Sequence, residues 1–348
     1  MTKGAVQICG LMSVALLSTG SLRMAAQESM APWTGGLPGI EHPAAWALGD
    51  TPFASGMQHA NRWTGGSGAM NDQWLGIGWT PQPKGGGWGN NISNWSFGLS
   101  NRIQAAGQGW NEMRHALHAA IKVPLAQDWK GSAGIGIGVR GWVLDGRQWS
   151  WDQQYGSGGY NPAAPTGEPD GLVAGAGLSP EVAVGFAWQH QQRSGQDPRF
   201  QGAVSLHHVL PITSAHFMTT HADTVRRTLS GWVETLGQLG NGALDGRAWL
   251  RGAWQGQSHL IEVGTGIGKS WGTTSRYTRN TLGHHFELGI IWRTDGVLRA
   301  PLTWQHGELT TWLAPGLQVG HPSPAAQGWA VGVTWNPDFT GATPMGSR

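Results

Sequence analysis

The stretch Val182-Ala183-Val184-Gly185-Phe186-Ala187-Trp188-Gln189 alternates large apolar residues with small or polar ones. A similar run, Trp329-Ala330-Val331-Gly332-Val333-Thr334-Trp335, stands near the C-terminus. Successive side chains of a β-strand point to opposite faces, so each run predicts a strand with one apolar face and one face of small or polar groups. Repeated along a glycine-rich chain, this pattern is typical of a transmembrane β-barrel with an apolar outside and a roomy lumen.

The composition favours a β-protein that is covered by lipid. The 348 residues include 22 tryptophans and 57 glycines, and only 12% are charged. A fraction of 12% is about half the usual fraction of charged residues, and a water-soluble surface normally needs more of them. The formal net charge is +2 and the basic residues are scattered, so no basic block indicates binding of nucleic acid.

The N-terminus has the features of an export signal. Lys3 supplies the positive charge, residues 11–17 form an apolar run, and Ala25-Ala26 is a plausible cleavage site, so residues 1–26 are predicted to be a signal peptide. The apolar run is too short to span a bilayer as a helix. The alternative is a short buried helix that stays attached. The single cysteine, Cys9, lies in this segment, which leaves the predicted mature chain without a thiol or a disulfide.

The rest of the chain is predicted to form one transmembrane antiparallel β-barrel. Residues 27–52, rich in Pro and Gly, form an N-terminal segment expected to pack against or inside the barrel, which comprises residues 53–348. About 14 strands are expected, an even number, as closure of a bacterial barrel requires. Alternation is poorest in the eighth and ninth of them, and an interruption is expected at Pro315. The predicted strands are 53–63, 73–80, 93–101, 111–125, 131–145, 181–192, 200–209, 214–221, 227–238, 246–255, 258–270, 284–293, 303–319 and 327–335.

Some of the predicted strands show their two faces clearly. From Met113 to Val123 the odd-numbered side chains suit lipid, whereas Arg114 and Lys122 share the other face. From Phe286 to Arg293 the formal charges again fall on one face. Glycine occupies every inward site of residues 134–139, which predicts that another backbone approaches the wall there. The stretch from Trp149 to Pro180 shows no regular alternation of apolar and polar residues and is predicted to be a long extracellular loop.

No motif predicts catalysis, a cofactor or a metal site, so the chain is not expected to be an enzyme. Gly264 to Ser270 resembles a phosphate-binding loop, but Val263 stands where that motif needs a glycine. Adjacent histidines such as His207 and His208 point to opposite faces of a strand, so they do not predict chelation by one strand. A metal site assembled across strands stays open. The chain has no Gly-x-Ser-x-Gly nucleophile elbow.

The tryptophans have two interpretations. At strand ends they fit the interfacial girdle of a barrel, whereas a cluster on loops would stack on sugar rings. The girdle is favoured because several lie on apolar faces or at strand ends, namely Trp79, Trp95, Trp188, Trp292 and Trp335.

Several short motifs occur in the order known from one protein family. They are His42-Pro43-Ala44 soon after the signal, Asn61-Arg62-Trp63 at the first strand, the glycine-rich strand pair 125–145, and the strands at 200–208 and 289–293. In these the chain resembles the PorP/SprF family of outer-membrane proteins, associated with the type IX secretion system and gliding motility of Bacteroidota. The chain departs from the family pattern in that His42 stands where members have Asn, and Arg62 and Trp63 are adjacent.

The resemblance implies an outer-membrane protein that assists export or cell-surface anchoring of a large secreted partner. The expected partners are a type IX secreted surface protein, other components of that system and the lipid of the outer membrane. Exposed aromatic residues are good interface anchors, so the candidate contact surface is the long loop with Trp149, Trp151, Tyr155 and Tyr160. Two alternatives stay open, an outer-membrane channel for small solutes and a secreted tryptophan-rich sugar-binding β-protein.

Overall fold

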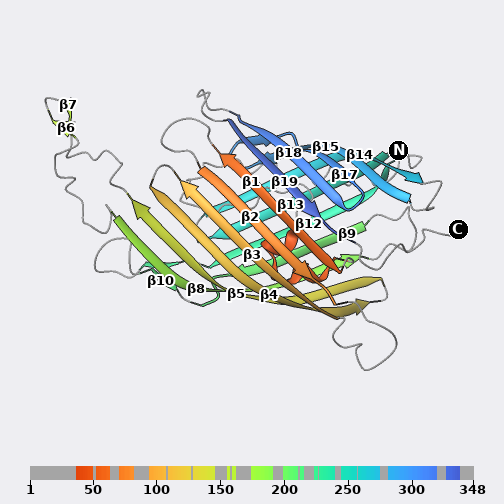
Figure 1. Ribbon diagram of the computed structural model, residues 1–348, viewed down its shortest axis with the longest axis horizontal. Helices are drawn as coiled ribbons and strands as arrows, with labels where there is room; N and C mark the ends of the chain where they lie inside the picture. The colour runs from red at the N-terminus through yellow and green to blue at the C-terminus, as the bar shows by residue number, and fades with distance from the viewer. Residues whose placement is uncertain are drawn as a thin grey trace.

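The strands of the protein form a barrel wall around a short N-terminal segment (Figure 1). No helix among the described residues is long and apolar enough to cross a membrane. The computed structural model describes residues 37–49, 52–62, 70–81, 94–106, 109–126, 128–145, 155–156, 159–161, 174–190, 199–210, 212–214, 223–225, 227–239, 244–256, 258–274, 281–319 and 327–337.

The wall is one closed antiparallel sheet. Each strand pairs with the next along the chain, and the last strand pairs with the first, from Ser55 opposite Trp335 to Asn61 opposite Trp329. The segments of the sheet are β1 (Phe53–Arg62), β2 (Met70–Trp79), β3 (Trp95–Ala106), β4 (Trp110–Ala126), β5 (Trp129–Asp145), β8 (Ala174–His190), β9 (Arg199–His207), β12 (Thr228–Leu239), β13 (Leu244–Gln255), β14 (Ser258–Thr274), β15 (Thr281–Arg293), β16 (Val297–Arg299), β17 (Leu302–His306), β18 (Leu309–Gln318) and β19 (Gln327–Trp335).

The predicted barrel of 14 strands is confirmed. The sheet contains 15 segments, but β16 and β17 both lie between β15 and β18 and are two parts of one wall strand. Two short hairpins pair apart from this sheet, β6 (Tyr155–Gly156) with β7 (Gly159–Tyr160) and β10 (Ile212–Ser214) with β11 (Asp223–Val225).

Two predicted strands are wrong in detail, although the total is right. The range 214–221 is not a wall strand, because β9 pairs directly with β12; residues 215–221 of it lie outside the described part of the chain. The range 303–319 is two strands, because Gly307, at a φ of 58°, turns the chain between β17 and β18. Pro315 does not interrupt β18, where it pairs with Trp329. The predicted long loop also ends earlier, since β8 begins at Ala174 and includes Pro180.

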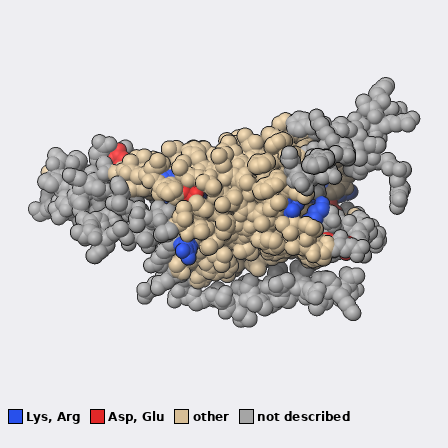
Figure 2. Space-filling view, turned by 90° about the horizontal axis from the view of Figure 1, so that it is seen from below, with Lys and Arg blue, Asp and Glu red and all other residues tan. Residues whose placement is uncertain are grey.

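The outer face of the wall is apolar. On β4 and β15, Leu117 and Leu288 are 67% and 55% exposed, whereas the inward Glu112 and Glu287 are only 2% and 5% exposed. The predicted faces of these two strands are therefore confirmed. Figure 2 shows a broad surface with few charged side chains over the middle of the molecule. Such a band fits the hydrocarbon layer of a bilayer.

The tryptophans occupy two environments. Trp79, Trp95 and Trp335 lie exposed on the outer face near strand ends, as the girdle interpretation predicts, and Trp188 and Trp292 are half-buried on the same face. A second group points into the barrel and is at least nine-tenths buried, which the girdle interpretation did not foresee. Its members on the wall are Trp74, Trp142, Trp232, Trp249 and Trp312.

Inward tryptophans lie against glycines on the neighbouring strand. Trp249 pairs with Gly264 and Trp312 with Gly332. A Cβ placed on Gly264 would be 2.2 Å from the Trp249 ring, and one on Gly332 would be 2.5 Å from the Trp312 ring. No larger residue fits there, so the glycine-rich inner face accommodates indole rings as well as open space.

The N-terminal segment fills part of the barrel. Its two short helices, η1 (Pro38–Ile40) and η2 (Pro43–Ala47), pack against the inner faces of β2 to β5, β8 and β9, and we call residues 37–49 the plug (Figure 1). At Gly134 an added Cβ would be 2.5 Å from the backbone nitrogen of Ala44. The predicted approach of another backbone to this glycine-rich strand is therefore confirmed.

We expect Gly264→Ala to lower the free energy of unfolding by about 1–3 kcal/mol, since its methyl group would overlap the Trp249 ring. Urea unfolding, followed by the heat-modifiable band of the folded barrel, measures the change. The matched control is Gly283→Ala on β15, where an added Cβ has nothing within 4 Å. Equal stability of the two variants would contradict the packing argument.

Candidate functional site

The two ends of the barrel differ in their connections. β1 begins and β19 ends at one end, which we call the terminal end. The connections at the other end, the loop end, include the long stretches from β5 to β8 and from β9 to β12. Outer-membrane barrels carry their longer loops outside the cell, so we expect the loop end to face the exterior.

A cavity of about 80 Å³ lies on the loop-end side of the plug. Its floor includes Ile40 and Glu41 of the plug, and its walls come from β2 to β5, β8, β9, β12 and β13. On β5, Gly136 borders the cavity, whereas Ser132, nearer the terminal end, contacts the plug. On each of the other strands that contact both the plug and the cavity, the residues that line the cavity are again nearer the loop end than those that contact the plug. The plug therefore separates the cavity from the terminal end.

Polar contacts hold the plug to three parts of the wall. The Ser132 hydroxyl on β5 donates to the Ala44 carbonyl oxygen at 2.7 Å. Ser205 Oγ on β9 and His42 Nδ1 are hydrogen-bonded at 2.8 Å. Across the lumen, Arg251 Nη2 on β13 lies 2.5 Å from Glu41 Oε2. These contacts fix the height of the cavity floor.

An indole ring anchors the plug by packing. Trp46 of η2 is 7% exposed and lies over glycines of β2 and β3. Added Cβ atoms at Gly78 and Gly98 would be 2.3 and 2.4 Å from its ring. The plug is thus seated by both apolar burial and hydrogen bonds.

The motif His42-Pro43-Ala44 forms the centre of the plug. All three residues are buried, with His42 2% and Ala44 0% exposed. The other residues singled out by the family resemblance are not brought to the cavity. Arg62 is the last residue of β1, and nothing is described of its side chain; Trp63 lies outside the described residues.

The predicted contact loop stays largely outside the described part of the chain. Trp149 and Trp151 lie in undescribed segments. Tyr155 and Tyr160 pair with each other in the β6–β7 hairpin, away from the cavity strands.

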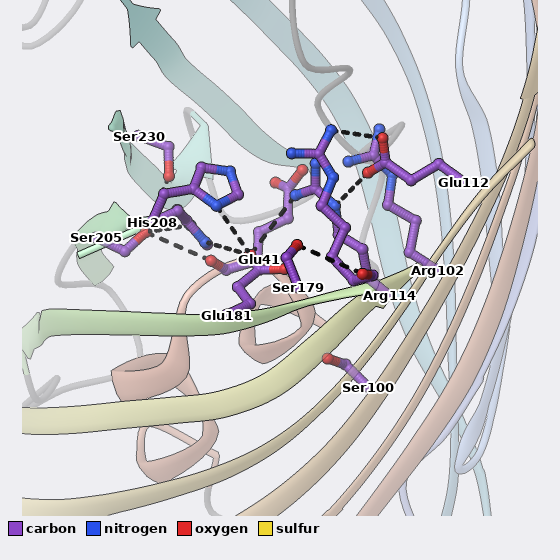
Figure 3. A network of polar contacts seen from close by, with 12 residues as sticks. Glu41, Ser100, Arg102, Glu112, Arg114, Ser179, Glu181, Ser205, His208 and Ser230 are labelled. Carbon is purple, nitrogen blue, oxygen red and sulfur yellow. Dashed lines mark hydrogen bonds and ion pairs between the residues drawn. The ribbon is translucent and has the colours of Figure 1, made fainter. Parts of the chain in front are cut away.

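A buried charge network lines the lumen beside the cavity (Figure 3). Glu112, 2% exposed, accepts from Arg114 Nε at 2.5 Å and from Arg140 Nη2 at 2.7 Å. Arg114 Nη1 also lies 3.7 Å from Glu181 Oε1 on β8. The sequence places Arg114 on the inward face of the same strand as Glu112, but its contact with Glu181 could not be identified, because Glu181 comes from another strand.

A separate group of three charged side chains links the plug to the wall. Arg251 lies between Glu41 and Glu262, with Nη1 3.5 Å from Glu262 Oε1. At the cavity wall, Arg102 lies 3.7 Å from Asp72 and 4.4 Å from the centre of the Trp74 ring. No sequence pattern indicates that Arg251 binds the plug, because Glu41 lies 210 positions away in the chain.

Ser205, His207 and Glu181 are arranged in the order of a serine nucleophile, its base and a carboxylate. Ser205 Oγ lies 3.1 Å from His207 Nε2, and His207 Nδ1 lies 4.0 Å from Glu181 Oε1. A nucleophile must be reachable, however, and Ser205 is 1% exposed. Its hydroxyl also contacts His42 and the hydroxyl of Ser230 at 2.9 Å. In this geometry Ser205 serves as an anchor of the plug, and the absence of enzymatic activity stays a prediction.

No group of three or more His, Cys, Asp or Glu side chains within the described ranges is arranged to hold a metal ion. His207 and His208 both lie near Glu181, at 4.0 and 3.9 Å, although they are adjacent in sequence. A positive φ of 55° at His208 turns the chain at this point, just beyond the end of β9.

No family model matches the chain, and no curated protein matches it. Among solved structures it is similar to the toluene transporter TbuX of Ralstonia pickettii, with 11% identity over 88% of this chain and 95% of that chain and a TM-score of 0.48. It is also similar to the toluene transporter TodX of Pseudomonas putida, with 9% identity over 89% and 94% and a TM-score of 0.44. A FadL homologue of Pseudomonas aeruginosa shows 10% identity over 87% and 95% and a TM-score of 0.38.

The closed barrel and its apolar outer band identify the location of the protein. In a closed sheet the backbone N–H and C=O groups of each strand pair with neighbouring strands. Such a sheet is stable in lipid when its outer side chains are aliphatic. The protein is a β-barrel of the outer membrane, as the sequence predicted.

Removing the central carboxylate of the charge network tests its contribution to folding. In Glu112→Gln, two guanidinium groups lose their shared buried carboxylate, and we expect the free energy of unfolding to fall by about 3 kcal/mol. The control is Glu308→Gln, because Glu308 is exposed in the β17–β18 turn and we expect a change within about 0.5 kcal/mol there. Urea unfolding of both variants measures the difference, and similar values would mean that the network contributes little.

Proposed function

We propose that the protein is an outer-membrane channel for small solutes, closed by the plug in this structure. The observation that carries the proposal is the cavity above Ile40 and Glu41, bordered by wall strands on its sides. It lies on the side of the plug that faces the exterior, where an incoming solute would arrive first. The proposal is one of the alternatives left open by the sequence.

The chemistry of the lumen fits the passage of water and solute. Charged and hydroxyl-bearing side chains, among them Arg114, Glu181 and Ser230, border the cavity. Polar lining is typical of barrels with a water-filled interior. A volume of about 80 Å³ accommodates roughly six waters, and so a solute with about that many non-hydrogen atoms.

Passage to the terminal end requires the plug to move. The plug is joined to the wall by non-covalent contacts, chiefly at Ala44, His42 and Glu41, and by the packing of Trp46. Its displacement would join the cavity to the terminal end. Lid opening in proteins takes microseconds to seconds, which is compatible with a gate.

The solute is not fixed by the structural likenesses. TbuX and TodX are described as toluene transporters, but the low TM-scores and identities leave the solute of this chain open. The role in type IX secretion that the PorP/SprF resemblance implies stays a prediction. Trp149 and Trp151, which would contact an exported partner, lie outside the described residues.

A bridge between plug and wall tests the channel and its gate. His42→Cys with Ser205→Cys places two thiols where hydrogen-bonded side chains now meet, and the natural Cys9 lies in the predicted signal peptide. We expect proteoliposomes with the reduced double variant to swell in glycerol. After bridging by a short bis-thiol reagent, the swelling rate should fall to that of protein-free liposomes.

Each single-cysteine variant is the control, because the same reagent cannot bridge it. Absence of swelling with the unmodified protein, over a range of small solutes, would overturn the channel. Swelling that persists in the bridged variant would show that solute passes without movement of the plug.

A further inference from the structure

We infer that the plug is a proton-sensitive gate, in which a proton on the His42 imidazole releases the plug from the wall. The switch itself belongs to the contact between plug and wall, and its consequence for transport rests on the proposed channel function. The inference comes from the position of His42 in that contact, from the charges around it and from the pH range in which an imidazole titrates.

The His42 side chain is sealed between the plug and the wall. It is 2% exposed, and its Nδ1 is hydrogen-bonded to Ser205 Oγ on β9 at 2.8 Å. Its ring centre lies 6.4 Å from that of Trp232 on β12. Because the wall supplies these neighbours, His42 is excluded from water only while the plug is docked. A group that is buried in one state and hydrated in the other couples proton binding to the movement between them.

The nearest charged groups oppose a positive charge on His42. His207 Nε2 of β9 lies 3.1 Å from the same Ser205 hydroxyl oxygen, and Arg251 of β13 pairs with the adjacent plug residue, Glu41. Burial, followed by the nearby His207 and Arg251, holds the pKa of His42 well below its ordinary value. The docked plug therefore favours a neutral imidazole.

The carboxylates on the surrounding strands already have partners of opposite charge. Their ion pairs, at 2.7 to 3.7 Å, are Glu234 of β12 with Arg247 of β13, Glu181 of β8 with Arg114 of β4, and Glu262 of β14 with Arg251. These carboxylates are held by their own guanidinium groups, so they give little compensation to a new charge at His42.

Other imidazoles lie near the same contact. His118 of β4 is 7% exposed, and its ring centre lies 6.2 Å from that of Trp46 in the plug. His207 and His208 lie 4.0 and 3.9 Å from Glu181. Since Trp46 leaves with the plug, the burial of His118 also depends on docking. The pH dependence of the intact protein is therefore expected to be at least as steep as that of His42 alone.

The direction of the pH effect follows from the two environments of His42. In water an imidazole has a pKa of about 6.5, whereas burial lowers the pKa of His42 in the docked plug. Docking is therefore strongest above this pH and weakens as the pH falls below it. For one proton, the equilibrium constant for release rises about tenfold between roughly pH 7.5 and pH 5.5. Carboxylates with ordinary pKa values of about 4 stay ionised in this range.

A thiol beneath the plug measures release without any transport step. Ser132→Cys places the reporter where the side chain is 0% exposed and contacts Ala44, and the predicted mature chain has no other thiol. The purified barrel in detergent is labelled with a pyridyl disulfide, which still reacts with thiols in acid. We expect the labelling rate to rise at least about tenfold from pH 7.5 to pH 5.5, relative to the exposed reporter Glu308→Cys. A heat-modifiable band confirms that the barrel is folded at each pH.

His42→Asn in the reporter protein tests which group takes up the proton. The amide keeps a hydrogen-bonding group for Ser205 but does not titrate, so we expect the rise in labelling between the two pH values to be about tenfold smaller. The control is His59→Asn, because the His59 ring lies 4.9 Å from the Trp329 ring on the outer face and away from the plug. It should keep the full rise. An equal rise in His42→Asn and in the unmodified plug would overturn the inference.

Swelling of proteoliposomes at the same pH values separates the switch from the channel. If labelling rises in acid but no solute causes swelling, the channel fails and the proton switch stands. If solutes cause swelling while the labelling rate of the reporter stays constant across the pH range, the channel stands and the switch fails.

Discussion

The close contact between the plug and the glycines of the wall sets the architecture of the lumen. A Cβ at Gly134 would be 2.5 Å from the Ala44 nitrogen, and one at Gly78 would be 2.3 Å from the Trp46 ring. Any side chain at these positions would push the plug toward the lumen axis. The polar anchors at Ser132 and Ser205 could then not be made at their observed distances. The depth of the cavity floor therefore depends on the absence of side chains in the wall.

The strand pattern was predictable from the sequence because alternation is a local property. The prediction from alternation was wrong where a turn interrupts a run that looks continuous in the sequence. Before Gly307 the outward residues of β17 are even-numbered, as at Leu302 and Trp304, whereas in β18 they are odd-numbered, as at Leu309 and Leu313. This change of parity at a two-residue turn was the available signal. In the range 214–221 alternation was already poor, and pairing of β9 with β12 excludes it from the wall.

The tryptophans show why residue type alone does not assign a face. Trp249 shares its parity with Arg247 and Arg251, and that parity places it inside the barrel. The glycine that receives its ring is on the next strand, and strand register is needed to identify such a partner. Sequence patterns thus predicted the wall and its polarity. The packing of the lumen depended on contacts between residues that only the closed sheet brings together.

The same limit applied to the plug, whose central motif was recognised but whose partners were not. Glu41 and Arg251 are 210 positions apart in the chain, and their ion pair links the cavity floor to the opposite wall. This link couples the gate to the charge of the lumen. If the plug moves, Arg251 keeps Glu262 but loses Glu41, and the cavity loses one of its carboxylates. Opening the proposed channel would therefore make the lumen more positive.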